Sequence, residues 1–96
     1  MIDTLSATPD ARNLTVLWDS GETSELPADV LRREARDAYS RREIIDHGEI
    51  RIAPDLTITG LFQVGREGVN VHFSDGHERA IYPFPYLREL SDRFGN

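Results

Sequence analysis

One tight turn, Asp75-Gly76-His77, brings together the side chains with the clearest capacity for chemistry. His77 offers an imidazole, Asp75 a carboxylate, and Glu78 a second carboxylate directly after them. Hard metal ions and iron bind well to such oxygen and imidazole ligands. The turn therefore has two interpretations: a metal site that uses His77 and Asp75, or a hairpin in which His77 hydrogen-bonds its own turn or packs on a helix.

The other two histidines leave the metal question open. His47 lies in an Asp-His-Gly-Glu loop, and His72 falls on the polar face of an expected strand. If both converged on His77, the three imidazoles could bind a metal ion. A turn separates His72 from His77, however, so the pair lacks the fixed geometry of two ligands one helical turn apart.

Enzymatic chemistry has little support in the sequence. There is no cysteine, so thiolate catalysis and disulfide bonds are excluded. No serine stands in a recognisable nucleophile elbow, and Gly65-Arg66-Glu67-Gly68 is typical of a hairpin rather than of a phosphate-binding loop. We expect a protein without catalytic residues.

The stretch of residues 71–90 positions the turn, because strand-like segments flank Gly76 and an apolar helical pattern follows them. Residues 14–34 repeat this order of strand, glycine turn, strand, proline and Leu-Arg. An internal duplication explains the repeat, and so do the general needs of any hairpin followed by a helix. In either case, each unit has one apolar face that the other unit must cover.

The remaining periodicity predicts an α+β fold: a small single domain with a mostly antiparallel sheet of short hairpins and two helices. Residues 1–12 lack a clear period and are expected to form a loose N-terminal arm, which leaves residues 13–95 as the domain. The expected helices cover about residues 27–39 and 84–94. The expected strands cover residues 14–18, 23–26, 49–53, 56–64, 69–74 and 78–82.

Length and charge exclude several functions. A chain of 96 residues builds one modest core and has no room for a large catalytic cavity. Its net charge of −6 argues against non-specific binding to nucleic acid, which depends on basic side chains at the phosphates. No apolar run approaches the ~20 residues of a membrane span, and the N-terminus lacks the features of a signal peptide. We expect a cytoplasmic protein.

An aromatic group accompanies the two repeated units, with Trp18 in the first unit and Tyr82 and Tyr86 in the second. These side chains have two interpretations. They fill the small core between the units, or they form an exposed patch for a partner protein. In the second interpretation, Arg32 and Arg88 are rim or anchor residues at matching places of the repeat. Interface hot spots favour tyrosine, tryptophan and arginine.

A resemblance to a known family rests on the run F-S-D-G-H-E-R-A-I-Y-P-F-P-Y-L-R-E-L and on the earlier unit W-D-S-G-E. Over residues 10–92 the chain resembles the N-terminal domain of gamma-butyrobetaine hydroxylase. That domain, the DUF971 or GBBH-like N-terminal family, also occurs alone in short bacterial proteins. The most specific part of the resemblance is D-G-H followed by I-Y and then L-R.

In the hydroxylase branch of the family, the D-G-H histidine resembles a zinc ligand. Three cysteines complete that site in a C-x-C-x-x-C run after the Leu-Arg of the first helix. The corresponding positions here are Ala35, Asp37 and Ser40, and none of them is cysteine. A Cys₃His site is a closed structural zinc site, and an imidazole with a carboxylate and a hydroxyl binds zinc much more weakly. The resemblance thus implies at most a single metal ion, zinc or iron, at His77 and Asp75.

The resemblance implies an interaction or adaptor module rather than an oxygenase, because the iron-binding H-x-D motif belongs to the hydroxylase's separate catalytic domain. Related domains are joined to ATPases of iron–sulfur cluster assembly. The implied partner is therefore a protein, either of iron–sulfur assembly or an oxygenase-type enzyme, and not nucleic acid or a membrane. A metal-binding protein that uses His77 is the alternative function. A homodimer is the simplest assembly.

Overall fold

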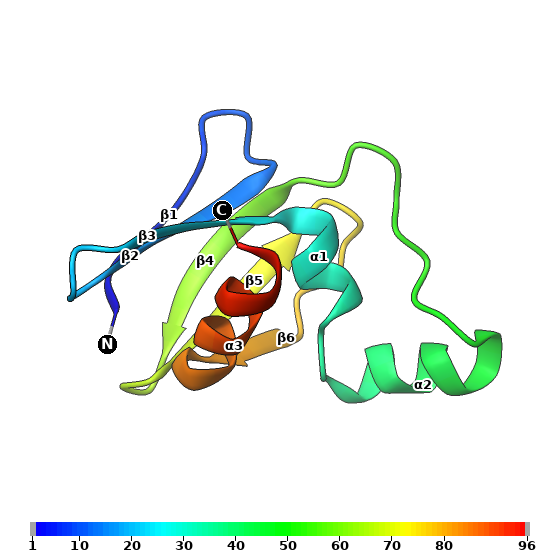
Figure 1. Cartoon of the computed structure of the whole chain (residues 1–96). Helices are drawn as coiled ribbons and strands as arrows, with labels where there is room; N and C mark the ends of the chain where they lie inside the picture. Colours follow the sequence, from blue (N-terminus) through cyan, green and yellow to red (C-terminus); the bar gives the residue numbers. More distant parts are fainter. Residues whose placement is uncertain (1, 96) are drawn as a thin grey trace.

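Two three-stranded antiparallel sheets form the framework of the protein, one in strand order β1-β2-β3 and one in order β4-β5-β6 (Figure 1). The computed structural model describes residues 2–95. Helices connect and flank the sheets, so the protein has the predicted α+β class. In chain order the elements are β1 (Ile2–Ala7), β2 (Asn13–Trp18), β3 (Thr23–Pro27), α1 (Ala28–Arg33), α2 (Ala38–His47), β4 (Ile58–Val64), β5 (Gly68–Phe73), β6 (Ala80–Pro83) and α3 (Phe84–Phe94).

Alternate residues of the strands build one hydrophobic core that both sheets share. In β2 and β5 every second side chain is buried and belongs to the same apolar cluster. This is the period of two that a strand with one covered face requires. Helix α3 adds Leu87 and Leu90, which lie three residues apart on its apolar face. The apolar pattern predicted for the last helix, Leu87, Leu90 and Phe94, is thereby confirmed for the two leucines, whereas Phe94 at the end of α3 is exposed.

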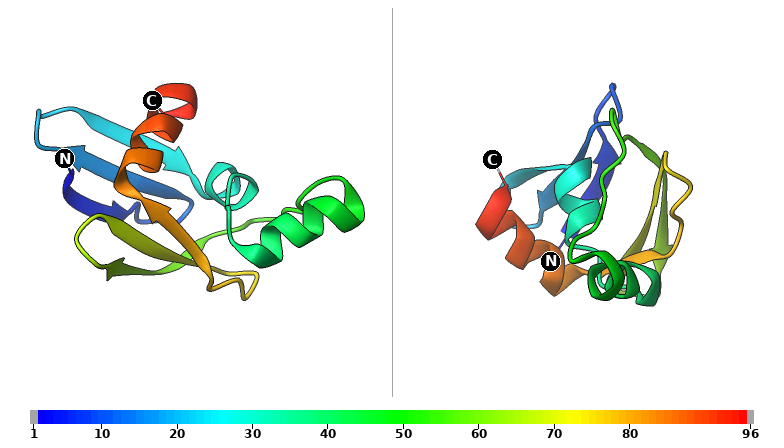
Figure 2. Two further views of the ribbon diagram at one scale, coloured as in Figure 1. Left: turned by 90° about the horizontal axis from the view of Figure 1, so that it is seen from below. Right: turned by 90° about the vertical axis from the view of Figure 1, so that its right-hand side faces the viewer.

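Helix α2 extends away from this core (Figure 2). Of the ten residues of α2, only Ser40 is buried. No side chain of α2 belongs to the apolar cluster. Ile44 and Ile45 are exposed on it. No helix in the described part of the chain is both long and apolar enough to cross a membrane.

Both glycine turns predicted from the sequence are present. Gly21 and Gly76 have φ angles of 92° and 88°, in the left-handed region that glycine enters without steric cost. They close the hairpins β2–β3 and β5–β6. The second turn also has the Gly76 N–H donating to the Phe73 carbonyl, at 3.1 Å.

The prediction of a loose N-terminal arm is wrong for residues 2–7, which form the edge strand β1. Leu5 lies opposite Val16 of β2 and packs against the core. The outward positions of this strand, Thr4 and Ser6, are exposed. The strand has only a few apolar residues, so its sequence alternates too weakly to predict a strand.

The prediction of a single helix over residues 27–39 is also wrong, because the chain forms α1 and α2 with residues 34–37 between them. The helical spacing of apolar residues continues across this break and hid it. Asp37 has an extended backbone, with φ −68° and ψ 163°, and its carboxylate accepts a hydrogen bond from the Ser40 N–H. This is N-capping geometry, so a new helix begins after Asp37.

The strand predicted for residues 49–53 is not formed. The Arg51 N–H donates to the Glu43 carboxylate at 2.9 Å instead of joining a strand ladder. Ile50 is buried, so the alternation in this segment reflects local packing of a loop.

Two tyrosines fix the C-terminal end of α1. The Tyr82 hydroxyl donates to the Leu31 carbonyl, and the Tyr86 hydroxyl donates to the Glu34 carbonyl at 2.7 Å. The last carbonyls of a helix have no intrahelical donor, so these hydroxyls take the place of N–H groups. Burial raises the pKa of Tyr82 well above its usual value, so its hydroxyl stays protonated and remains a donor.

Replacing Tyr82 with Phe should lower the free energy of unfolding by about 1–3 kcal/mol, because the Leu31 carbonyl loses its donor inside the protein. The control is Y39F, since the Tyr39 side chain is exposed and makes no hydrogen bond with residues 2–95. Urea denaturation of both variants measures the difference. Equal stability of Y82F and Y39F would show that the hydroxyl does not stabilise the end of α1.

Candidate functional site

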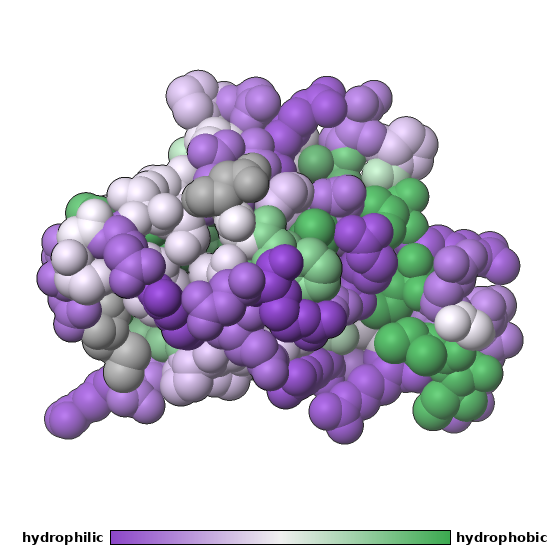
Figure 3. All heavy atoms as spheres, in the orientation of Figure 1, coloured by the Kyte–Doolittle hydropathy of each residue, from purple (hydrophilic) through white to green (hydrophobic). Residues whose placement is uncertain are grey.

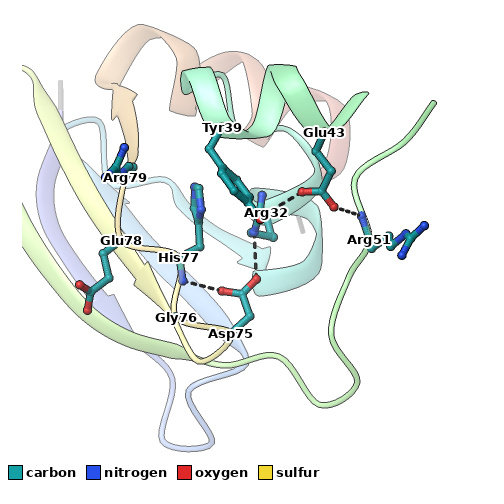
Figure 4. A pocket seen from close by; sticks show the side chains of 9 residues that line it. All are labelled: Arg32, Tyr39, Glu43, Arg51, Asp75, Gly76, His77, Glu78 and Arg79. Atoms are coloured by element: carbon teal, nitrogen blue, oxygen red, sulfur yellow. Dashed lines mark hydrogen bonds and ion pairs between the residues drawn. The ribbon is translucent and has the colours of Figure 1, made fainter. Parts of the chain in front are cut away.

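A cleft at the predicted site has a volume of about 630 Å³ and lies between the β5–β6 turn and α2 (Figure 4). It is polar and open to solvent at one side. Its walls come from α1, α2, the loop after α2 and the turn. The lining residues are Arg32, Tyr39, Glu43, Arg51, Asp75, Gly76, His77, Glu78 and Arg79.

His77 points from the β5–β6 turn toward the start of α2. Its backbone N–H donates to Asp75 Oδ1 at 2.9 Å, which fixes the turn. Its ring Nε2 lies 3.0 Å from Asp37 Oδ1. The ring of Tyr39 covers one side of the imidazole, with 5.6 Å between the ring centroids. His77 therefore joins two segments that are 40 residues apart in the chain.

Asp37 connects the turn with α2. Besides the bond with His77, its carboxylate accepts from the Ser40 N–H at 3.1 Å and from the Ser40 hydroxyl at 2.7 Å. Burial raises the pKa of Asp37, but the hydrogen bonds from Ser40 and His77 outweigh burial, and the net pKa lies below the ordinary aspartate value. The carboxylate is thus ionised at neutral pH and can only accept. We infer that His77 carries its proton on Nε2.

Arg32 lies beneath these groups and is 3% exposed. Its Nε donates to Asp75 Oδ2 at 3.0 Å, and its Nη1 donates to the Ser40 hydroxyl at 2.9 Å. Nη2 pairs with a Glu43 carboxylate oxygen at 3.5 Å. The guanidinium is therefore surrounded by acceptors from α2 and from the turn (Figure 4).

These contacts form one connected network, which we call the polar clasp. It joins the end of α1, the start of α2 and the β5–β6 turn. Its members are Arg32, Asp37, Ser40, Asp75 and His77.

The two residues predicted as metal ligands do meet, but in a turn that they stabilise themselves. Both oxygens of Asp75 accept hydrogen bonds, one from the His77 N–H and one from Arg32. His72 pairs instead with Glu78, at 3.4 Å, and His47 is exposed at the end of α2. Within residues 2–95, no three potential ligands of a metal ion come together. The three histidines do not converge.

The donor set at the clasp does not fit a structural zinc ion. Ala35 has no donor atom, and the Ser40 hydroxyl already bonds Asp37. The buried guanidinium of Arg32 adds a fixed positive charge beside Asp75, which disfavours a second cation there. The residues present serve one another as hydrogen-bond partners instead.

Most residues predicted as an exposed interaction patch lie inside the protein. Trp18, Tyr82, Tyr86 and Arg32 are buried, so their prediction as a surface patch is wrong and the core interpretation of the aromatic residues is confirmed. Arg88 is half-buried: its guanidinium lies 5.2 Å from the centroid of the Trp18 ring and pairs with Glu22 at 3.2 Å. The aromatic side chains fill the core, and the two tyrosines also bind the carbonyls at the end of α1. The residue types alone do not distinguish these roles from an exposed patch.

Sequence reasoning missed Arg32, Asp37 and Ser40 as members of the site. Two signals were available. Asp37 and Ser40 occupy positions that the family resemblance assigns to ligands, and an arginine on the apolar side of a helix needs buried acceptors.

The fold and this arrangement define a small α+β domain with a polar connection between its helical region and its second hairpin. The family match agrees with the resemblance seen in the sequence: the profile "Gamma-butyrobetaine hydroxylase-like, N-terminal" matches residues 5–88. The chain belongs to this family.

Solved structures show the same fold. A protein of unknown function of the DUF971 family from Acidithiobacillus ferrooxidans ATCC 23270 is 27% identical, with a TM-score of 0.73, over 94% of this chain and 91% of that chain. Two protein structures solved by NMR are 24% and 23% identical, with TM-scores of 0.76 and 0.71. They cover 96% and 97% of this chain and 69% and 73% of their own chains. No curated protein matches.

Replacing Ser40 with Ala should cost about 1–3 kcal/mol of stability, because Arg32 and Asp37 each lose a buried partner. Ser91 is the matched control: it is also buried, but its hydroxyl has no hydrogen-bond partner among residues 2–95. S91A should change stability by less than about 0.5 kcal/mol. Chemical denaturation measures the free energy of unfolding of both variants. An equal loss of stability in S40A and S91A would contradict the hydrogen bonds of Ser40 in the polar clasp.

The stabilising effect of Asp37 should depend on pH in one direction. Its folded pKa is lowered, so its contribution is fully present above the unfolded aspartate pKa of about 3.9 and is lost as the pH falls through the folded value. The difference in unfolding free energy between the parent and D37N should thus shrink as the pH falls below about 4. A difference that grows as the pH falls below about 4 would contradict the lowered pKa.

Proposed function

We propose that this chain is a non-enzymatic interaction module that binds a partner protein through the outer face of the sheet β4-β5-β6. The supporting observation is the exposure of three large apolar side chains on this face. Phe62 is 54% exposed, Val64 41% and Ile81 47%. An antiparallel sheet with one face on the core normally presents polar residues on the other face.

The strand register places these three residues on one face of the sheet. Phe62, Asn70 and Ile81 lie in one row across the three strands. In the next row, Val64 and Pro83 flank Gly68, which has no side chain. The result is a face on which exposed apolar side chains of β4 and β6 flank Asn70 and Gly68 of β5.

The other sheet provides an internal comparison. Its outward positions include Ser6 and Thr15, which lie opposite each other, and Glu25, which lies opposite Thr15 on β3. That face has the polar character expected of a solvated sheet. The apolar character of the β4-β5-β6 face is therefore not a general property of this fold.

The charges near the face indicate the kind of partner. Arg66 follows Val64 in the β4–β5 turn, and Arg79 precedes β6 beside Ile81. Neither arginine has an ion pair with any residue from 2 to 95. Exposed arginines beside apolar side chains are typical of interface rims and anchors. We therefore propose a partner protein with an apolar surface and an acidic rim.

Helix α2 also exposes apolar residues, but they form no continuous face. Tyr39 and Ile44 are five residues apart, so they point about 140° away from each other around the helix. On the sheet face, by contrast, the strand register places Phe62 and Ile81 in the same row. The clasp residues are engaged with one another, which supports a binding role over catalysis at His77. The family resemblance directs the search for a partner to iron–sulfur assembly proteins and oxygenase-type enzymes.

A site-specific photo-crosslinker tests this proposal. Placed at Phe62 or Ile81, it should link the same partner in cells, whereas at Thr15 on the other sheet it should not. The identified partner is then purified and titrated with the parent, I81D and T15D. I81D should weaken binding by at least about tenfold, because interface hot spots cost more than 1 kcal/mol, and T15D should have no effect.

Charge reversal is the second measurement. R66E/R79E should weaken binding most at low salt, since rim charges act through screened electrostatics. Crosslinking from Thr15 alone, or equal effects of I81D and T15D, would exclude this face. A crosslinked dimer of the chain itself would identify a second copy as the occupant and contradict the proposed partner.

A further inference from the structure

The position of α2 depends on few interactions. Among its residues only Ser40 is buried, and Ser40 belongs to the polar clasp. The apolar residues Ile44 and Ile45 are exposed, and Figure 3 shows hydrophobic side chains on the surface over α2 and the loop that follows it. A helix with no apolar side chain in the core gains little from hydrophobic packing. Polar contacts must therefore determine where it lies.

Those polar contacts converge on a buried cation. The Arg32 guanidinium donates to Ser40 of α2 and to Asp75 of the turn, and it pairs with Glu43 one helical turn after Ser40. Its planar donors reach several acceptors at once, which a single ammonium group does less well. The charge of Arg32 also offsets the carboxylates that gather around it. The Arg32 guanidinium thus supplies the positive charge at the centre of these contacts.

The Asp37–His77 bond completes the connection. It joins the N-cap of α2 to the β5–β6 turn with a heavy-atom distance of 3.0 Å. Both side chains are almost completely buried, so water competes little for the bond. We infer that the polar clasp holds α2 against the β5–β6 hairpin without a metal ion, with the Arg32 guanidinium as the internal cation that joins the two segments.

At two of the positions that the family resemblance assigns to cysteine, this chain has hydrogen-bonding residues. Asp37 and Ser40 bond directly to each other and, through Asp37, to His77. Three of the four expected ligand positions therefore meet in this chain, and hydrogen bonds take the place of metal bonds. The fourth position, Ala35, is buried in the apolar core.

The direct test measures metal content, thermal unfolding and amide hydrogen exchange of the untagged chain purified without chelators. We expect no stoichiometric metal and the same Tm with excess EDTA or added zinc chloride. In R32M, the α2 amides should exchange at least about tenfold faster, while the core strands β2 and β5 keep their protection. R33M is the control on the same helix, because Arg33 is exposed and has no partner in residues 2–95.

Stoichiometric metal in the parent that is lost in H77A, or a lower Tm in EDTA, would overturn the inference. Unchanged exchange of α2 in R32M would also overturn it. If R32M does not fold, S40A provides the same comparison with a smaller lesion, with S91A as its control.

A gain-of-metal variant tests whether the clasp occupies the position of a metal site. A35C/D37C/S40C, with His77 retained, should bind stoichiometric zinc, and EDTA should lower the Tm of this variant but not that of the parent. Adding H77A to the triple variant should abolish the effect of zinc. Failure of the triple variant to bind zinc would show that these four positions do not share one site and would contradict the inferred replacement.

Discussion

The buried charge of Arg32 constrains the rest of the helical region. A guanidinium without water requires acceptors for its donors, and an unpaired buried charge costs several kcal/mol. Here the acceptors come from Ser40 and Glu43 of α2 and from Asp75 of the β5–β6 turn. The need to satisfy one cation thus fixes both the start of α2 and the shape of the β5–β6 turn.

The same requirement explains why the chain does not continue α1 into α2. A continuous helix would give Asp37 helical backbone and would direct its carboxylate along the helix rather than toward His77. Instead, Tyr82 and Tyr86 bind the carbonyls at the end of α1, and Asp37 caps the new helix. Local helix propensity favours continuation, but side-chain hydrogen bonds from distant segments favour the break.

Much of the fold was predictable from periodicity, because a period of two with glycine turns specifies antiparallel hairpins. The edge strand β1 and the break between α1 and α2 were not, since both depend on partners far along the chain. For the site, local sequence identified the turn with Asp75 and His77. It could not show that Arg32 lies against Asp75, 43 residues away, because no local rule encodes that contact.

Successive side chains of strand β6 point alternately into the core and onto the proposed binding face, and the turn before β6 carries the clasp residues Asp75 and His77. Tyr82 points inward to α1, whereas Ile81, its neighbour, points outward into the exposed apolar face. Because successive side chains of a strand lie on opposite faces, a change at one position acts on the core and a change at the next acts on the surface. Loss of binding in a variant at Ile81 with unchanged stability would therefore report on the surface itself. The clasp, on the far side of the turn that leads into β6, can hold α2 while the outer face stays free for a partner.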